Sequence, residues 1–299
     1  MRDVLIVGGA TSGLSAALVL GRCRRSVLVC DAGRPRNRFS RHMHGFLSRD
    51  GIAPYEFLRI GREQLTAYPD IEFRTATVDA IERRDRHFAV RIDDGTDVLT
   101  RMVLLATGVV DELPEIPGLA DFYGVSVHHC PYCDGWEHRD EPIAVFGRAR
   151  AAAEMAQEML GWTRDIVVCT HGEPLGGEDA ELLRKIRVPV RDQAIRELRG
   201  SAGVLEEIVF EDGSTIARKA LFFSTAQHQQ TELAQGLGCT QDSDRLIECH
   251  DGVRTSVPGV FAAGNTSTGL QLAIVAAAEG AKAAWAINQA LLAEIGPAF

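Results

Sequence analysis

The stretch VLIVGGATSG at residues 4–13 joins a short apolar run, rich in β-branched residues, to a glycine-rich turn. Leu14–Leu20 then reads as a helix, and Val27–Val29 is a second apolar run that ends at Asp31. A strand, a helix and a second strand within about 30 residues are typical of the βαβ unit of a parallel sheet. The N-terminal region therefore predicts an α/β domain with a doubly wound sheet.

The same order of signals recurs near the middle of the chain. Ile143–Phe146 is an apolar run, Gly147 opens an alanine-rich helix over Ala149–Leu160, and Ile166–Val168 follows as a strand. The second unit begins at Ile143, whereas the first begins at Val4. Repetition at so long a spacing indicates two similar domains rather than a solenoid of short repeats. We therefore expect an α/β protein with two doubly wound, Rossmann-like domains.

Turn and breaker signals lie around the second unit. Two Asp-Gly turns, at residues 93–95 and 211–213, each predict a hairpin. The expected hairpin strands are His87–Ile92 with Asp97–Leu105, and Gly203–Phe210 with Ser214–Leu221. A breaker cluster at 114–118 and a polar stretch at 241–245 are the candidate crossings between the domains.

Composition excludes several classes of protein. With 45% hydrophobic and 24% charged residues, the chain has the balance of a folded protein rather than a disordered one. Its net charge is −9 and it has no basic run, so neither nucleic acid nor an anionic membrane is an expected partner. No stretch reaches the roughly 18 apolar residues of a membrane span, and the first apolar run is too short for a signal peptide. We expect a cytoplasmic protein.

The first turn has the pattern of a dinucleotide fingerprint, Gly8-x-Ala10-x-x-Gly13. The first glycine permits a tight turn, the last permits close packing of helix on strand, and the helix N-terminus then faces a pyrophosphate. Asp31 stands at the end of the next strand, where an acid accepts hydrogen bonds from a ribose. The alternative is a glycine turn that caps a helix in a sheet without a nucleotide.

The sequence Cys130-Pro131-Tyr132-Cys133 is the most specific chemical feature. Two cysteines separated by two residues can close a small disulfide ring, and a thiolate at a helix N-terminus is stabilised. Pro131 suits the first position of such a helix. Asp134 follows directly and could move the proton that thiol–disulfide exchange requires.

Two other readings of this segment stay open. His128, His129, Cys130, Cys133 and His138 could form a zinc site, and the cysteines could have a purely structural role. Neither is preferred, because the chain has no second Cys-x-x-Cys and the histidines lack the usual spacing of ligand pairs. Seven cysteines, five of them single, also argue against a secreted disulfide scaffold. We therefore predict no metal site.

Taken together, these motifs resemble the low-molecular-weight thioredoxin reductase family. The resemblance, which includes the Ala106-Thr107-Gly108 turn, covers nearly the whole chain and is most specific at Cys130–Gly135 and Thr255–Asn265. It implies an FAD-binding domain made from residues 1–113 and 245–299, with a smaller nicotinamide-type domain at 114–244 inserted into it. It also implies a homodimer.

Site residues follow from the resemblance by position. Cys133 would lie against the flavin ring, Cys130 would exchange with the substrate disulfide, and Asp134 would be the acid/base. The adenosine and pyrophosphate part of FAD would contact Gly8, Gly9, Thr11, Ser12, Gly13 and Asp31. The remainder of FAD would contact Thr107, Gly108, Gly264, Asn265, Gln271, Leu272 and Ala273.

The chain departs from the family pattern in the second domain. The turn at residues 147–152 keeps one glycine, and residues 169–173 read Cys-Thr-His-Gly-Glu where family members carry a basic cluster for the NADPH 2′-phosphate. Arg148, Arg150 or His171 could substitute, but their spacing does not match. A 2′-phosphate without its cations loses strong charge-assisted bonds, which puts NADPH binding in doubt. Two departures fall in the first domain, at Asn265 and at Gln271-Leu272.

A branch of the family without a productive nicotinamide site resembles this chain more closely in its Cys-Pro-Tyr-Cys motif, Gly135-Trp136-Glu137, Thr170-His171-Gly172 and the Gln271–Gly280 helix. It includes the flavin-dependent dithiol oxidases of gliotoxin- and holomycin-type pathways, which commonly have His where this chain has Asp134. At Asp134 the chain resembles the reductases instead, but one acid/base can replace another, whereas a 2′-phosphate without its cations loses strong bonds. Our leading hypothesis is therefore an FAD-dependent oxidase that converts a small-molecule dithiol to a disulfide and passes the electrons to oxygen. The alternatives are an NADPH-dependent reductase of thioredoxin or a small disulfide, and a flavin-bound redox sensor without turnover. The expected partner is a small dithiol or disulfide, or a thioredoxin-like protein.

Overall fold

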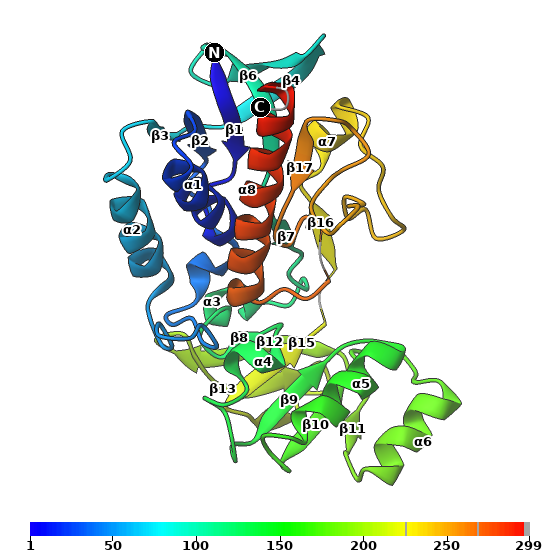
Figure 1. The fold of residues 1–299 in the computed structure, drawn as a ribbon. Coiled ribbons are helices and arrows are strands. Elements are labelled where there is room, and N and C mark those ends of the chain that lie inside the picture. The colour runs from blue at the N-terminus through cyan, green and yellow to red at the C-terminus, as the bar shows by residue number, and fades with distance from the viewer. Residues whose placement is uncertain (225, 268, 296–299) are drawn as a thin grey trace. The chain divides into compact units, whose positions relative to one another are not determined.

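Strand β1 (Arg2–Val7) is an interior strand of a seven-stranded sheet. The structure is a computed structural model, and it describes residues 1–224, 226–267 and 269–295. The order β3-β2-β1-β6-β5-β4 has β17 beside β6 (Figure 1). Strands β3, β2, β1, β6 and β17 run parallel, whereas β4, β5 and the first half of β6 form an antiparallel meander. The remaining bounds are β2 Val27–Asp31, β3 Ile71–Thr75, β4 Val78–Arg84, β5 His87–Ile92, β6 Asp97–Leu105 and β17 Val260–Ala262.

Both faces of β1 are buried, as is usual for an interior strand of a parallel sheet. Val4 and Ile6 pack in one core cluster with the helices, whereas Leu5 and Val7 pack in a second cluster with the meander. This explains why the strand reads as a continuous apolar run rather than as an alternating pattern.

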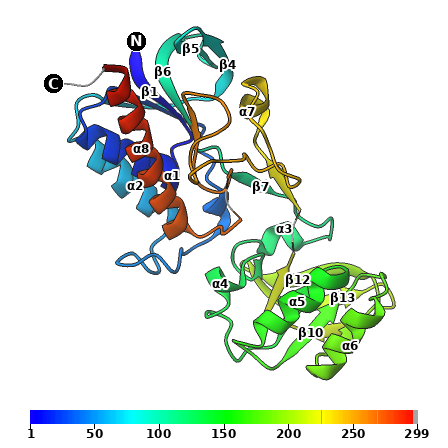
Figure 2. The ribbon, with the colours of Figure 1, turned by 45° about the vertical axis from the view of Figure 1, so that its right-hand side comes forward.

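Helices α1 and α8 lie side by side next to this sheet, as Figures 1 and 2 both show. The bounds are α1 Thr11–Arg22, α2 Pro54–Leu65, α7 Glu232–Gly236 and α8 Ala273–Ile295, with a short 3₁₀ helix, η1, at Arg36–Phe39. In the parts of the chain that the structure describes, no helix is both long and apolar enough to cross a membrane.

The second unit has its own parallel sheet, with five strands in the order β11-β10-β9-β15-β8. A separate antiparallel sheet, β12-β13-β14, belongs to the same unit, and β7 pairs with β16. The strands of this unit are β8 Val127–His128, β9 Ile143–Phe146, β10 Ile166–Cys169, β11 Val190–Arg191, β12 Ile195–Ser201, β13 Val204–Phe210, β14 Thr215–Ala217 and β15 Ala220–Phe223. Strands β7 Val109–Asp111 and β16 Gln227–Gln229 lie where the chain passes between the units. The helices are α3 Leu119–Phe122, α4 Pro131–Asp134, α5 Ala149–Met159 and α6 Gly177–Lys185.

The prediction of two doubly wound units is confirmed, because β1-α1-β2 and β9-α5-β10 are both parallel βαβ units. One strand prediction is wrong. The expected strand Ser214–Leu221 is split into β14 and β15, which belong to different sheets. The split falls at Arg218 and Lys219, where the backbone N–H of Lys219 donates to Pro142 O and the chain leaves the hairpin. The all-apolar β15 then enters the parallel core.

The chain crosses between the two compact units at 110/111 and 227/228, whereas the candidate crossings in the sequence are the segments 114–118 and 241–245. Residues 228–244 pack with the first unit, because Ala234 and Cys239 lie in the core cluster of the meander. Residues 39–44 pack with the second unit, where Arg41 donates to Ala202 O. Residues 296–299, at the end of the predicted FAD-binding segment, lie outside the described residues.

Glycine is required at two positions of the first turn. Gly8 has a φ of +104°, and a Cβ added there would collide with Ala106 O on the neighbouring strand. A Cβ at Gly13 would collide with Gly8 O. The first turn of α1 therefore sits directly on the end of β1, as the fingerprint predicts.

We predict that Gly13→Ala destabilises the first unit. The added methyl meets backbone atoms that cannot move aside, so we expect a loss of about 1–3 kcal/mol of unfolding free energy, as for overpacked cores. Thermal unfolding followed by circular dichroism measures the change. Gly236→Ala in α7 is the matched control, because a Cβ there meets open space. Equal stability of the two variants would contradict the prediction.

Candidate functional site

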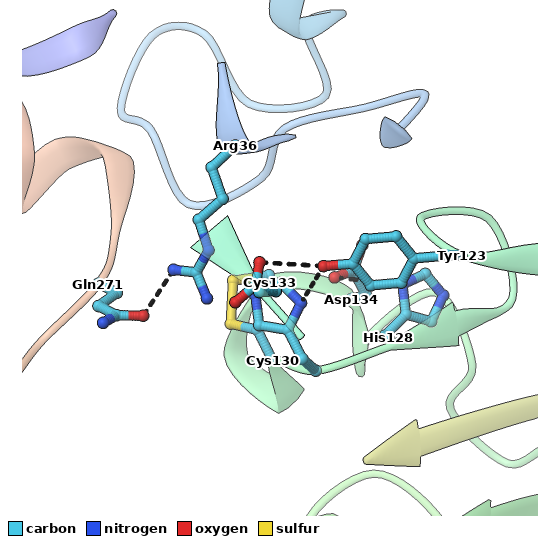
Figure 3. Close-up of a disulfide and its surroundings, with 9 residues drawn as sticks. Arg36, Tyr123, His128, Cys130, Cys133, Asp134 and Gln271 are labelled. Carbon is cyan, nitrogen blue, oxygen red and sulfur yellow. Dashed lines mark hydrogen bonds and ion pairs between the residues drawn. A yellow bond between two sulfur atoms is a disulfide. The ribbon is translucent and has the colours of Figure 1, made fainter. Parts of the chain in front are cut away.

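The two cysteines of the Cys-x-x-Cys motif form a disulfide (Figure 3). Cys130 caps the single turn α4, with Pro131 at its first position, and the Cys130–Cys133 Cα–Cα distance is 5.3 Å. Both cysteines are half-buried. The predicted disulfide ring is thus present.

An acid and a buried histidine adjoin this disulfide. Asp134 Oδ2 lies 3.4 Å from Nδ1 of His128, which is only 4% exposed (Figure 3). His128 Nε2 lies 3.1 Å from His138 Nε2, and His138 Nδ1 lies 3.0 Å from Glu141 Oε2. Burial lowers the pKa of His138, which favours its neutral form. Asp134 is therefore one end of a contact chain of four titratable side chains.

The neighbouring His129 belongs to a different network. Its Nδ1 lies 3.0 Å from the Tyr123 hydroxyl, which is also 3.1 Å from Asp111 Oδ2. Gln227 Nε2 donates to the other carboxylate oxygen of Asp111. The two adjacent histidines, 128 and 129, therefore face different partners.

Gly135 is fixed by packing beside the disulfide. A Cβ at this position would lie 2.6 Å from Pro131 O and 2.9 Å from the Trp162 ring. The Asp134-Gly135 pair therefore combines an acid with a position that no side chain can occupy. Trp136, which follows, is exposed and stacks with Arg139 rather than packing in a core.

Four of the residues considered for a zinc site contact one another directly, in pairs. The two sulfurs are bonded to each other, and His128 and His138 turn their Nε2 atoms toward one another. Within residues 1–224, 226–267 and 269–295, no group of three or more His, Cys, Asp or Glu is placed to hold a metal ion.

Buried thiols elsewhere do not compete with the dithiol as nucleophiles. Burial raises the pKa of Cys30 to about 11 and that of Cys169 to about 12. Both groups therefore stay protonated near neutral pH, whereas the thiolate is the reactive form.

The predicted FAD-contacting residues of the first unit lie along one edge of its sheet. Register pairs Val7 with Cys30 and with Leu105, and Leu105 with Ala262. The carboxyl ends of β1, β2, β6 and β17 are therefore adjacent, and ligands of open α/β sheets bind at that edge. Asp31 is the last residue of β2, and the turns that follow β1, β6 and β17 carry Gly8–Gly13, Thr107 with Gly108, and Gly264 with Asn265.

The start of α1 fits a pyrophosphate. Helix α1 begins at Thr11, no side chain caps it, and its first turn has no acidic residue. Its N-terminal N–H groups and the positive end of its dipole therefore suit an anion.

Asp31 has a partner that the sequence did not reveal. Its Oδ2 accepts from Arg62 Nη2 at 2.7 Å, and the Arg62 guanidinium lies 4.6 Å from the centre of the Phe73 ring. Arg62 Nε is buried and has no hydrogen-bond partner. An unsatisfied buried donor beside the expected ribose acceptor fits a further acceptor group supplied by a nucleotide.

A second residue that the sequence did not reveal, besides Arg62, supports the turn after β17 at Gly264 and Asn265. Glu279 on α8 accepts from the Gly264 N–H at 2.7 Å. Thr107 Oγ1 donates to Gln230 O, and Gln271 Oε1 accepts from Arg36 at 2.5 Å (Figure 3). Gln271 and Leu272 precede α8, which begins at Ala273. The signal for Glu279 in the sequence is an acid within the alanine-rich first half of this helix.

The second nucleotide-type turn has its cations engaged. Arg148 pairs with Glu173 at 3.0 Å and Arg150 with Glu154 at 2.7 Å. His171 Nδ1 accepts from the Ile195 N–H at 2.9 Å. None of the three proposed substitutes for the basic cluster is thus placed as a dedicated phosphate ligand.

Comparison with known proteins identifies the family. Residues 2–280 match the family described as pyridine nucleotide-disulphide oxidoreductase, and the chain belongs to it. Thioredoxin reductase tcpT of Claviceps purpurea is 32% identical over 90% of this chain and 88% of its own length. The structure of HlmI matches with a TM-score of 0.95 and 38% identity, over 98% of this chain and 93% of HlmI. An oxidoreductase from Agrobacterium tumefaciens matches with a TM-score of 0.90 and 35% identity, over 97% and 98%.

These matches confirm the predicted resemblance and class of protein. The chain is a flavoprotein redox enzyme with FAD as its cofactor. The turn geometry, the open start of α1 and the unsatisfied Arg62 donor all agree with that cofactor.

We predict that Glu279→Ala weakens FAD retention. Losing the carboxylate leaves the Gly264 N–H without this acceptor, which costs about 1–3 kcal/mol for a buried donor. Flavin released during gel filtration measures retention. Glu294→Ala is the control, because Glu294 is on the same helix but pairs with Arg101 at an exposed position. Equal flavin content in the two variants would show that Glu279 does not support the turn.

Proposed function

We propose that the protein oxidises a small-molecule dithiol to a disulfide through Cys130 and Cys133, with FAD as electron carrier and oxygen as acceptor. One contrast carries the proposal. The disulfide has an acid and a buried histidine beside it, whereas the candidate cations of the second nucleotide-type turn are already engaged. Similarity to HlmI and to a named thioredoxin reductase supports thiol–disulfide chemistry in general.

The exchange balances in two steps. One substrate thiolate attacks Cys130 Sγ, which breaks the Cys130–Cys133 bond and forms a mixed disulfide. The second substrate thiolate attacks the substrate sulfur of that mixed disulfide, which releases Cys130 and the substrate disulfide. Two electrons pass to the cysteines, and Asp134 can accept the thiol protons one at a time. Bound FAD would take the two electrons from the cysteine pair and pass them to oxygen, giving hydrogen peroxide.

The charges around the second nucleotide-type turn favour a thiol substrate, rather than NADPH, as the electron donor. A 2′-phosphate near Arg148 would have to displace the Glu173 carboxylate or tolerate it nearby. Like charges at contact distance are unfavourable, and the cation is shared rather than dedicated. The affinity of this turn for NADPH should therefore be low, which disfavours a reaction that begins with NADPH binding.

The second candidate is an NADPH-dependent reductase of thioredoxin or of a small disulfide. Asp134 favours it, because the reductases have Asp at this position, and the similar proteins include named thioredoxin reductases. The same cysteines and acid would then work with electrons flowing toward the substrate.

We also propose a cytoplasmic homodimer that binds neither nucleic acid nor membrane. The net charge of −9 opposes binding to polyanions. Trp285 on α8 is 62% exposed, and large exposed aromatic side chains are enriched at subunit interfaces. Sedimentation of the protein and of Trp285→Lys tests the dimer and this face together.

An anaerobic titration separates the two candidate reactions. We expect dithiothreitol to bleach the flavin absorbance, NADPH to leave it unchanged, and oxygen to restore the colour after dithiol reduction. Fast bleaching by NADPH would favour the reductase and contradict the oxidase. A colourless protein after purification would overturn both.

Cys133→Ser should abolish dithiol-driven bleaching while the protein keeps its FAD. The disulfide cannot form without the second sulfur, so no electron pair can pass through it. Cys23→Ser is the matched control, because Cys23 is an exposed free cysteine. If Cys133→Ser still oxidises the dithiol, the proposed mechanism is wrong.

A further inference from the structure

A continuous line of titratable side chains leads from the dithiol to an exposed carboxylate. The line runs from Asp134 through His128 and His138 to Glu141. The side chains are 18%, 4%, 12% and 42% exposed in that order. The two imidazoles are thus buried, and Glu141 is the end that solvent reaches.

The buried stretch has apolar surroundings. The Phe222 ring lies 5.3 Å from the His128 ring and 6.0 Å from the His138 ring. The charged and titratable groups that act on His138 are Glu141, His128 and Asp134, all members of the line. The two imidazoles therefore face each other in largely apolar surroundings.

Hydrogen-bond polarity orients the line. If Glu141 is ionised, His138 Nδ1 must carry the proton that it donates, so a neutral His138 presents Nε2 as an acceptor. His128 Nε2 must then be the donor, which leaves His128 Nδ1 as an acceptor toward Asp134. Once Asp134 has taken a thiol proton, it can donate to His128 Nδ1, and each neutral ring is then oriented to receive a proton from the side of Asp134 and to release one toward Glu141.

We propose that His128, His138 and Glu141 form a proton relay that carries the thiol proton from Asp134 to solvent. This inference rests on the proposed role of the dithiol and assigns its proton path. Protonated Asp134 gives its proton to His128 Nδ1, His128 Nε2–H passes one to His138, and His138 Nδ1–H passes one to Glu141. One proton leaves Asp134, one arrives at Glu141, and each ring ends in its opposite tautomer.

One contact must contract for the first transfer. The Asp134–His128 distance of 3.4 Å is long for a hydrogen bond, whereas the next two distances are ordinary. Catalytic hydrogen bonds commonly tighten only when substrate is bound. Because Glu141 lies at the exit, its loss should slow proton release without touching the sulfurs.

Stopped-flow reduction of the holoenzyme by dithiothreitol under anaerobic conditions tests the relay. The readout is flavin absorbance, at low and high concentrations of imidazole buffer and constant ionic strength. At low buffer concentration we expect dithiothreitol to reduce the flavin of Glu141→Gln about tenfold more slowly than that of the wild type. This is less than the rate loss that removal of a general acid or base itself causes. Added imidazole should restore the rate by carrying the proton, while wild type stays insensitive to buffer.

His138→Gln is the second variant, and Glu154→Gln is the control. The control makes the same charge change on α5, where Glu154 pairs with Arg150 at an exposed position. A slow variant that buffer does not restore would assign the line a structural role and overturn the relay. Wild-type rates in both variants at low buffer would show that Asp134 exchanges protons directly with water.

The reaction with oxygen does not enter this experiment. A wild-type protein that dithiothreitol cannot reduce would overturn the proposed function and the relay with it. A normal wild type with unaffected variants would overturn the relay alone.

Discussion

Close backbone contact at the first turn is the constraint on which the first unit depends. Only a hydrogen atom fits between residue 13 and the Gly8 carbonyl, so α1 must start where β1 ends. A Cβ at Gly280 would likewise collide with Ser12 O, so α8 is held against the same turn. The two ends of the chain thereby meet at the edge where the cofactor is expected. Glu279, one residue before Gly280, can then reach the Gly264 N–H.

How much the sequence predicts depends on how local the signal is. The two βαβ units have their strand, glycine and helix within a few dozen residues, and both were predicted. The split at Arg218 was missed because the residues of β14 and β15 follow one another closely, and strand signals alone do not reveal that they pair in different sheets. Arg62 and Glu279 were missed for a related reason, since their partners lie 31 and 15 residues away on other elements.

The functional site likewise has a part that is local in the sequence and a part that depends on the fold. The dithiol and its acid are consecutive residues, so their chemistry can be read directly from the sequence. His128 and His138 were considered as zinc ligands, because composition gives the residue types and not the directions in which their nitrogens point. In the fold, β8 carries His128 toward Asp134 and the chain after α4 returns His138 to its other nitrogen. Placement on different elements turns a candidate ligand set into a candidate relay.

The two nucleotide-type turns share a backbone pattern but differ in the side chains around them. Both have a parallel strand, a glycine and a helix, so backbone geometry alone does not distinguish them. The difference lies in the side chains that meet the phosphate and ribose. Near Asp31 a buried donor of Arg62 still lacks an acceptor, whereas Arg148 already has Glu173 and His171 already has the Ile195 amide. A site with an unsatisfied donor gains a hydrogen bond when a nucleotide binds, and a site with paired cations must first break one. On this ground we infer that the electrons enter as thiols.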